Sequence, residues 1–277
     1  MDRFFALIDE KHLIKKQASQ LGIIAPPMHL RLVILFASMA GLLAIEAVNS
    51  SVLAQKTSPK KIHRELVVKQ LQQYAKSITV KVISNDSWGS GVIIQRKGKV
   101  YLVLTNEHVL SRGKQHQIQV ADGSIYSTNL LPAIGSKDDL GLMQFYSPTI
   151  VYPVAVLKQT SRLQVGNRVF AGGFPFDINL SNSGKFELTT GKISDLLKQP
   201  LIGGYQIGYS NNVKRGMSGG PLLDIQGEVV GINGMPKYPL LGNPYVFKDG
   251  STVSEARWQD MSHLSWAIPI SIFLHLL

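Results

Sequence analysis

Three short motifs carry the residues of this chain whose types could do chemistry. His108 stands in the motif TNEHV, Asp139 follows Asp138 at the start of the run DDLGL, and Ser218 lies in the glycine-rich motif GMSGGP. Each motif alone has an ordinary explanation, since histidines occur at strand ends and Asp and Gly form turns. Their combination needs a chemical explanation.

A hydroxyl, an imidazole and a carboxylate are together the parts of nucleophilic acyl transfer. The imidazole takes the proton of the hydroxyl, and the carboxylate selects the tautomer of the imidazole and stabilises its charged form. His108 and Asp139 are 31 residues apart and Asp139 and Ser218 are 79 apart, so the first two can share one β-barrel and the serine can come from a second. The N–H groups of Gly216 and Ser218 would form an oxyanion hole, because a backbone bent to aim two N–H groups at one point tolerates few side chains.

The elements that must position these residues are short strands. Apolar or alternating runs of strand length are separated by Gly, Asn, Asp, Ser and Pro, and no long amphipathic helix interrupts them. This pattern predicts an all-β sandwich or a pair of barrels. The expected strands are 78–83, 90–95, 100–105, 116–121, 140–145, 168–173, 185–194, 205–210, 221–225, 228–233 and 264–269.

Residues 1–54 are predicted to be a lead and an export signal with a helical apolar segment. Residues 32–45 are 14 consecutive uncharged residues, fewer than the roughly 20 that a membrane-spanning helix needs. A positive residue precedes them, and small residues ending at Ala54 form a signal-peptidase site. A start at Met28 would give a signal of ordinary length, and we expect translation to begin there. The alternative is an uncleaved segment, 32–48, that anchors the protein in a membrane.

The rest of the chain is basic and has no cysteine. The sequence has 29 Lys+Arg and 18 Asp+Glu, a net charge of +11, of which residues 1–54 account for only +1. With 44% hydrophobic residues the chain is not disordered, and without cysteine it has no disulfides or thiolate zinc sites. The basic residues are scattered and no nucleic-acid-binding motif is present, so the charge predicts anionic substrates or surfaces rather than nucleic acid. Residues 55–75 form a basic lead-in, with a helix expected near 62–75.

The three motifs resemble those of the chymotrypsin-like (trypsin-fold) serine peptidases, and within them the bacterial branch that includes HtrA-like enzymes. The similarity covers roughly residues 76–274 and rests on TNEHV (105–109), DDLGL (138–142) and GMSGGP (216–221), with weaker support from GSGVII (89–94), GEVVGING (227–234) and WAIPI (266–270). The resemblance implies a peptidase domain over 76–277 made of two antiparallel six-stranded β-barrels. The first barrel would span about 76–160 and the second about 161–274.

The same resemblance assigns roles to single residues. His108 would be the general base, Asp139 its orienting acid and Ser218 the nucleophile. Asp139 is preferred to Asp138 because the acid of the family directly precedes an apolar strand. Asn233, Gly234 and Met235 would lie on an edge strand that pairs with the substrate backbone, and Asn212 would lie at the base of the pocket for the side chain before the scissile bond.

Some positions depart from the pattern of the family. Met217 stands where enzymes activated by a new N-terminus carry Asp, so that activation by propeptide cleavage is not expected. The asparagines at 212 and 233 predict a neutral specificity pocket. Because the chain ends at Leu277, we do not expect a PDZ module.

Two other functions fit part of the sequence pattern. The motif GMSGG also matches the G-x-S-x-G pattern of α/β-hydrolase esterases, but the two strands expected after Ser218 do not fit the strand-turn-helix of that fold. The same double barrel could also be a catalytically inactive module that binds peptides or a partner. We expect no metal and no cofactor, a protein or peptide as substrate, no nucleic-acid partner, and contact with a membrane only through the N-terminal segment.

Overall fold

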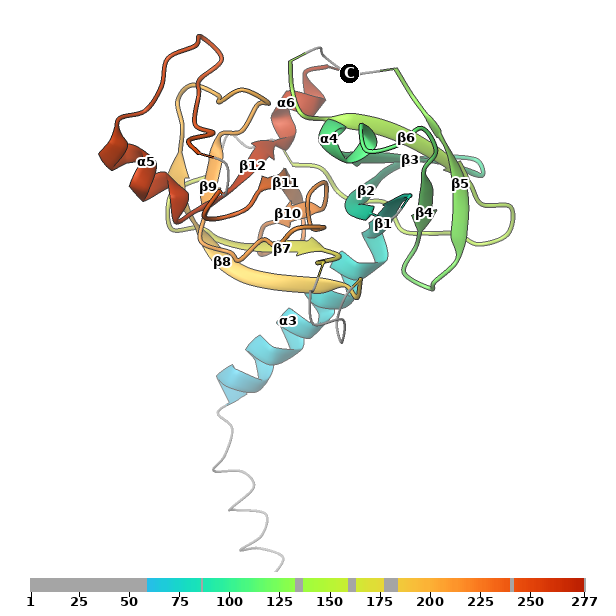
Figure 1. Ribbon diagram of the computed structural model, residues 1–277. Coiled ribbons are helices and arrows are strands. Elements are labelled where there is room, and N and C mark those ends of the chain that lie inside the picture. The colour runs from blue at the N-terminus through green and yellow to red at the C-terminus, as the bar shows by residue number, and fades with distance from the viewer. Residues whose placement is uncertain are drawn as a thin grey trace, which may run out of the picture. The chain divides into compact units, whose positions relative to one another are not determined.

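The computed structural model describes residues 59–85, 87–132, 137–158, 163–176, 184–239 and 242–276. The signal predicted over 1–54, the start at Met28 and the alternative anchor over 32–48 lie outside the described residues. Within those residues, no helix combines the length and the apolar character that crossing a membrane requires. The two β-barrels predicted from the sequence are confirmed, and Figure 1 shows them side by side.

The first barrel closes in the strand order β1-β2-β3-β6-β5-β4, and every pair is antiparallel. Strand β5 was not predicted, because its sequence IYSTNL is half polar and most of its side chains are exposed or half-buried. The strands are β1 (Thr79–Ser84), β2 (Ser87–Lys97), β3 (Val100–Thr105), β4 (Gln117–Gln119), β5 (Ile125–Leu130) and β6 (Gly141–Tyr146).

The second barrel closes in the order β10-β11-β12-β9-β8-β7, again with antiparallel pairs. All six of its strands overlap strands expected from the sequence. They are β7 (Arg168–Gly173), β8 (Glu187–Leu196), β9 (Ile207–Tyr209), β10 (Pro221–Leu223), β11 (Val229–Met235) and β12 (Ser265–Pro269).

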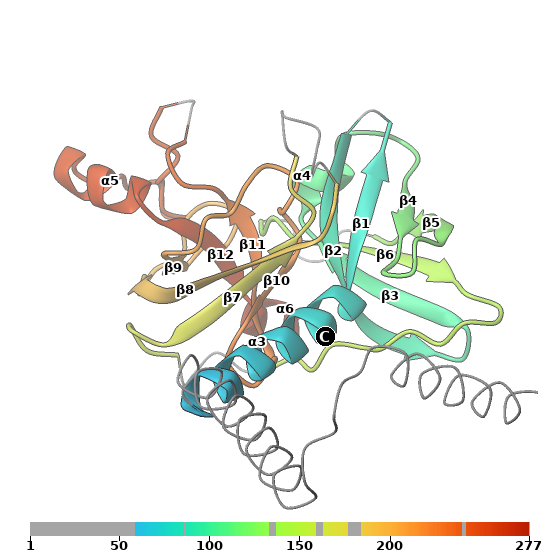
Figure 2. The ribbon, with the colours of Figure 1, turned by 90° about the horizontal axis from the view of Figure 1, so that it is seen from below.

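Four helices accompany the strands in the described residues. The helix expected near 62–75 is longer in the structure, where α3 spans Pro59–Ile78 and leads directly into β1 (Figure 2). Three short helices were not predicted: α4 (Glu107–Leu110), α5 (Glu255–Ser262) and α6 (Ile270–Leu274). Helix α5 begins at an N-cap, because the Ser254 side chain accepts a hydrogen bond from the Arg257 N–H.

The buried apolar residues form three clusters. Each barrel has a core of its own, and a third cluster joins buried residues of α3 with residues of both barrels. Strand β2 shows why: the side chain of Ile93 lies in the core of the first barrel, whereas Val92 and Ile94, on the opposite face, lie in the joining cluster. A strand that is buried on both faces needs a continuous apolar run, and the sequence GVII provides it.

Candidate active site

His108 and Asp139 are brought together by the pairing of two neighbouring strands. Strands β3 and β6 are antiparallel, with Thr105 opposite Gly141, so the turn after β3 meets the residues before β6. The His108 backbone N–H donates to Oδ1 of Asp139 at 2.8 Å, and His108 Nδ1 lies 2.6 Å from Oδ2. Two bonds from one residue to the two carboxylate oxygens fix both the position and the ring orientation of the histidine.

The neighbouring carboxylate, Asp138, has a different partner. Its Oδ1 lies 2.5 Å from the Lys248 ammonium. The Asp139 backbone is held separately, since its N–H donates to the Gly203 carbonyl at 2.9 Å and its carbonyl accepts from the Asn106 side chain at 2.8 Å. Of the two acidic residues, only Asp139 contacts the histidine among the hydrogen bonds and ion pairs of the described residues.

Ser218 lies in the loop between β9 and β10, packed against β2 of the other barrel. Its carbonyl accepts a hydrogen bond from the Ser90 N–H at 2.8 Å. Gly219 has a φ of +85°, and a side chain there would collide with the Ser90 carbonyl and the Thr105 hydroxyl. This close approach explains the glycine after the serine. The Ser218 hydroxyl donates to the Gly234 carbonyl at 3.1 Å, and no hydrogen bond within the described residues joins it to His108.

Hydrogen bonds fix two peptide groups of the backbone just before Ser218. In a trans peptide the C=O and the next N–H point in opposite directions. The Arg215 carbonyl accepts from Phe176 N–H at 2.7 Å, which fixes the Gly216 N–H, and the Met217 carbonyl accepts from Gly220 N–H at 3.1 Å, which fixes the Ser218 N–H. Neither N–H has an acceptor among the described residues.

Ser90 ties this loop to the first barrel a second time. Its hydroxyl donates to the Gly216 carbonyl at 2.8 Å and accepts from the Phe174 N–H at 2.9 Å. The Ser90 carbonyl in turn accepts from the Thr105 hydroxyl at 2.6 Å. Sequence reasoning did not single out Ser90, although the motif GSGVII that contains it was noted.

The residues predicted to bind substrate are placed in different ways. Asn233 is fully buried: its side-chain amide donates to the Gly172 and Pro221 carbonyls and its oxygen accepts from Tyr209. Its backbone N–H and carbonyl also bond to Gly220 and Gly219. The prediction that Asn233 lies on an edge that pairs with the substrate backbone is therefore wrong, because its backbone N–H and carbonyl are already bonded to the serine loop.

The substrate-binding role stays a prediction for three other residues, Asn212, Gly234 and Met235. The Asn212 side chain is exposed, unlike its neighbour Asn211, whose amide donates to the Thr189 carbonyl at 2.8 Å inside the barrel. The pairing of β11 with β10 ends before Gly234 and Met235. On the edge of β11 that faces β10, these two residues therefore have no strand partner in the described residues. Met217 is fully buried, in agreement with its apolar character.

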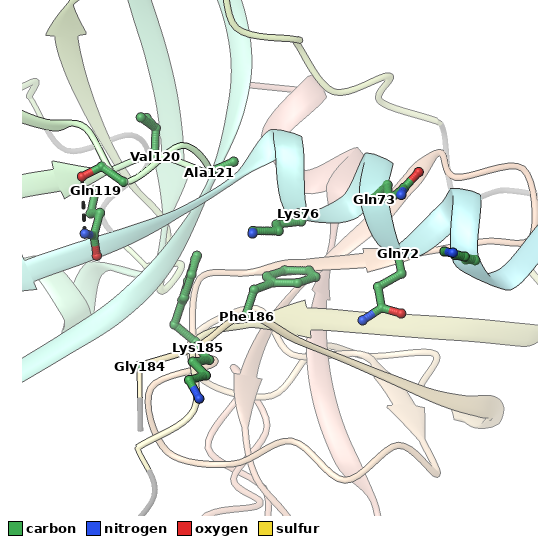
Figure 3. Close-up of a pocket in the computed structure, with 12 residues that line it drawn as sticks. Gln72, Gln73, Lys76, Gln119, Val120, Ala121, Gly184, Lys185 and Phe186 are labelled. Atoms are coloured by element: carbon green, nitrogen blue, oxygen red, sulfur yellow. Dashed lines mark hydrogen bonds between the residues drawn. The ribbon is translucent and has the colours of Figure 1, made fainter. Parts of the chain in front are cut away.

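Two hollows of about 560 Å³ are each lined by residues of both barrels. One contains the histidine and the acid and is lined by Glu107, His108, Ser111, Lys137, Asp138, Asp139, Ile202, Gly203 and Lys248. The other lies beside α3, where Lys76, Gln119 and Phe186 line it (Figure 3). Because this second hollow contains none of His108, Asp139 and Ser218, it is not the place of their chemistry. No group of three or more potential metal ligands occurs in the described residues.

Comparison with known proteins finds similar proteins among the serine proteases. The family model described as "Trypsin-like peptidase domain" matches residues 89–232. The mouse protein "Serine protease HTRA4" is 31% identical over 189 residues, which cover 65% of this chain and 35% of that protein. The "Periplasmic pH-dependent serine endoprotease DegQ" of Escherichia coli (strain K12) is 36% identical over 150 residues, covering 52% and 30%. The chain thus spans about a third of the length of these relatives.

Solved structures show the same fold. The crystal structure of Deg5 matches with a TM-score of 0.57 at 20% identity, over 76% of this chain and 92% of that one. The serine endoprotease from Yersinia pestis matches with a TM-score of 0.54 at 24% identity, over 75% and 64%. The fold is therefore the chymotrypsin-like double barrel of these proteases.

Proposed function

The chain belongs to the trypsin-like peptidase domain family, and we propose that it is an exported serine endopeptidase that uses His108, Asp139 and Ser218. The single observation that carries this proposal is the pair of bonds from His108 to both oxygens of Asp139. A histidine held this way keeps its proton on Nδ1 and leaves Nε2 free to accept one.

The reaction begins when the Ser218 hydroxyl turns from the Gly234 carbonyl toward Nε2 of His108. Nε2 takes the hydroxyl proton while Oγ forms a bond to the substrate carbonyl carbon. The imidazolium then gives that proton to the leaving amine as the peptide C–N bond breaks. Water, activated by the same nitrogen, hydrolyses the acyl-enzyme and restores the serine hydroxyl.

The N–H groups of Gly216 and Ser218 stabilise the negative oxygen of the tetrahedral intermediates. Each N–H belongs to a peptide group whose carbonyl accepts a hydrogen bond and is thereby fixed. Little reorganisation of the two donors is therefore needed during the reaction. The loss of one such donor typically costs about 2.7–4 kcal/mol in the transition state.

The substrate is a protein or peptide that adds a strand beside Gly234 and Met235. Once the serine hydroxyl has turned away, the Gly234 carbonyl can accept an N–H of the substrate backbone. Asn212 contributes an uncharged group to the pocket for the side chain before the scissile bond. The net charge of the chain, +11, favours anionic substrates or surfaces.

The proposed location is outside the cytoplasm. The relative DegQ and a DegP-like protein of Brucella suis are named as periplasmic proteins, and residues 32–54 have the pattern of an export signal. N-terminal sequencing of the exported protein tests the proposal. Cleavage after Ala54 is the expected result, and a mature protein that keeps residues 32–48 would show an anchor instead.

The catalytic proposal is tested by labelling with a fluorophosphonate, which reacts with activated serines. We expect the native protein to be labelled and to cleave a denatured protein substrate, and Ser218→Ala to do neither. The matched control is Ser127→Ala, because Ser127 is an exposed serine on β5, outside the site.

Two outcomes would contradict the proposal. Labelling that persists in Ser218→Ala would show that another residue reacts. A folded native protein that binds a peptide but is neither labelled nor active would identify the inactive binding module instead.

A further inference from the structure

The hydroxyl of Tyr205 lies where the two halves of the candidate site meet. It donates a hydrogen bond to Oδ2 of Asp139, the same oxygen that pairs with His108 Nδ1. The ring also packs directly against Gly234, where an added side chain would collide with the ring and with the hydroxyl. The Gly234 carbonyl in turn accepts the hydrogen bond of the Ser218 hydroxyl. The side chain of Tyr205 therefore contacts both the acid and the glycine that holds the nucleophile.

A tight turn from the second barrel holds this tyrosine against the acid. Leu201 N–H donates to the Tyr205 carbonyl at 3.0 Å and Gly204 N–H donates to the Leu201 carbonyl at 2.9 Å. Gly203 and Gly204 have φ values of +82° and +87°, which side chains rarely adopt. The Gly203 carbonyl accepts from the Asp139 N–H, so the turn binds the backbone and the carboxylate of Asp139 together.

The hydroxyl is in the right protonation state to donate. Tyr205 is only 5% exposed. Burial raises the pKa of its phenol well above the usual value, and the negative charge of Asp139 raises it further. The phenol therefore keeps its proton at neutral pH, and the carboxylate accepts it as a charge-assisted hydrogen bond.

We propose that Tyr205 is a positioning residue of the catalytic apparatus: its hydroxyl orients the Asp139 carboxylate toward His108, and its ring sets the place of Gly234 and thereby of Ser218. The role rests on the proposed peptidase function. Without the phenol, Oδ2 would keep only the imidazole as a hydrogen-bond partner within the described residues, and the carboxylate could rotate away from the plane of the ring.

The decisive variant is Tyr205→Phe, which removes the hydroxyl and keeps the ring. We expect kcat to fall about tenfold with KM unchanged, because the acid loses a charge-assisted hydrogen bond that holds its orientation toward the histidine. The matched control is Tyr245→Phe. Tyr245 is equally buried, and its hydroxyl donates to the Met261 carbonyl at 3.1 Å, away from the site. The control is expected to keep its kcat.

A second measurement does not depend on catalysis. The proton on Nδ1 of His108 has its own NMR resonance, and we expect Tyr205→Phe to shift it because the acceptor oxygen loses its second donor. A ring-fluorinated tyrosine at position 205 keeps the fold and strengthens the donor, so it is expected to shift the resonance in the opposite direction. Tyr245→Phe should leave the resonance in place.

The two measurements separate failure of this proposal from failure of the proposed function. If the native protein reacts with the fluorophosphonate and Tyr205→Phe changes neither kcat nor the resonance, the positioning role is overturned. If the native protein does not react but the resonance shifts as expected, the peptidase function fails and the bond from Tyr205 to Asp139 is supported. Equal loss of kcat in Tyr205→Phe and Tyr245→Phe would also overturn the proposal, because it would reflect a general effect on packing.

Discussion

The two barrels have the same strand count and order of closure, but they position their parts of the site by different means. In the first barrel, His108 and Asp139 lie at the ends of adjacent strands, and the pairing of β3 with β6 brings them together, while Gly203 and Tyr205 of the second barrel add bonds to Asp139. In the second barrel, Ser218 lies in a loop that is held by Ser90 of the first barrel.

The pairing of His108 with Asp139 is thus set mainly within one sheet, whereas the position of the Ser218 loop depends on the contact between the barrels. The acid and base meet because one sheet is in register, and bonds from the second barrel then support the acid. The position of the serine loop, in contrast, depends from the start on bonds that cross from one barrel to the other. Small polar changes at the contact should therefore affect the serine loop more than the folding of either barrel.

The largest expected effect comes from the acid of the first barrel. We expect Asp139→Asn to lower kcat roughly 10⁴-fold, because an amide at this position favours the wrong tautomer of His108. Asp138→Asn is the control, since Asp138 pairs with Lys248 and not with the histidine, and it should change kcat little. Peptide-hydrolysis kinetics measure both, and the reverse pattern would show that Asp138 is the acid.

An intermediate effect on kcat is expected at Ser90, whose hydroxyl links the two barrels. Ser90→Ala removes the bond to the Gly216 carbonyl and should lower kcat about 100-fold, the usual order for a disturbed oxyanion hole. The melting temperature should also fall, because the Gly216 carbonyl and the Phe174 N–H both lose their partner at a buried position. Ser87→Ala is the control, because Ser87 lies on the same strand and its hydroxyl bonds only to the Ser84 carbonyl in the described residues. If Ser90→Ala keeps its kcat, the loop is held without this bond.

The smallest effect concerns the stability of the first barrel in acid. Burial lowers the pKa of His116, against a smaller opposite effect of the nearby carbonyls of Leu110 and Val109. The unfolded chain then binds a proton more readily than the folded one. Stability is therefore full above the ordinary histidine pKa, and it falls as the pH drops below that value.

Urea unfolding between pH 5 and 8 measures this loss. We expect His116→Phe to reduce the slope of stability against pH by at most about 1.4 kcal/mol per pH unit, the limit for one proton. His263→Phe is the control in the second barrel, because His263 is exposed. An unchanged slope in His116→Phe would show that other groups cause the loss in acid.

Sequence patterns predicted the apolar strands better than the polar ones. Buried strands such as β3 and β6 have nearly continuous apolar runs, which are visible without the fold. Strand β5 has no such signal, since its half-polar sequence is ordered by hydrogen bonds to β4 and β6. Asn233 was misplaced because a buried amide and a substrate-facing amide have the same letter in the sequence, and only its three side-chain bonds tell them apart.

By itself, the sequence determined the strand-rich fold and the three motifs with His108, Asp139 and Ser218, because acyl transfer needs particular side chains and the glycines around them. Only the tertiary structure decided what supports them. The bond from Tyr205 to Asp139 spans 66 residues of chain, and the bond from Ser90 to Gly216 spans 126. Contacts over such separations depend on how two closed barrels pack together, and no local pattern of residues encodes that packing.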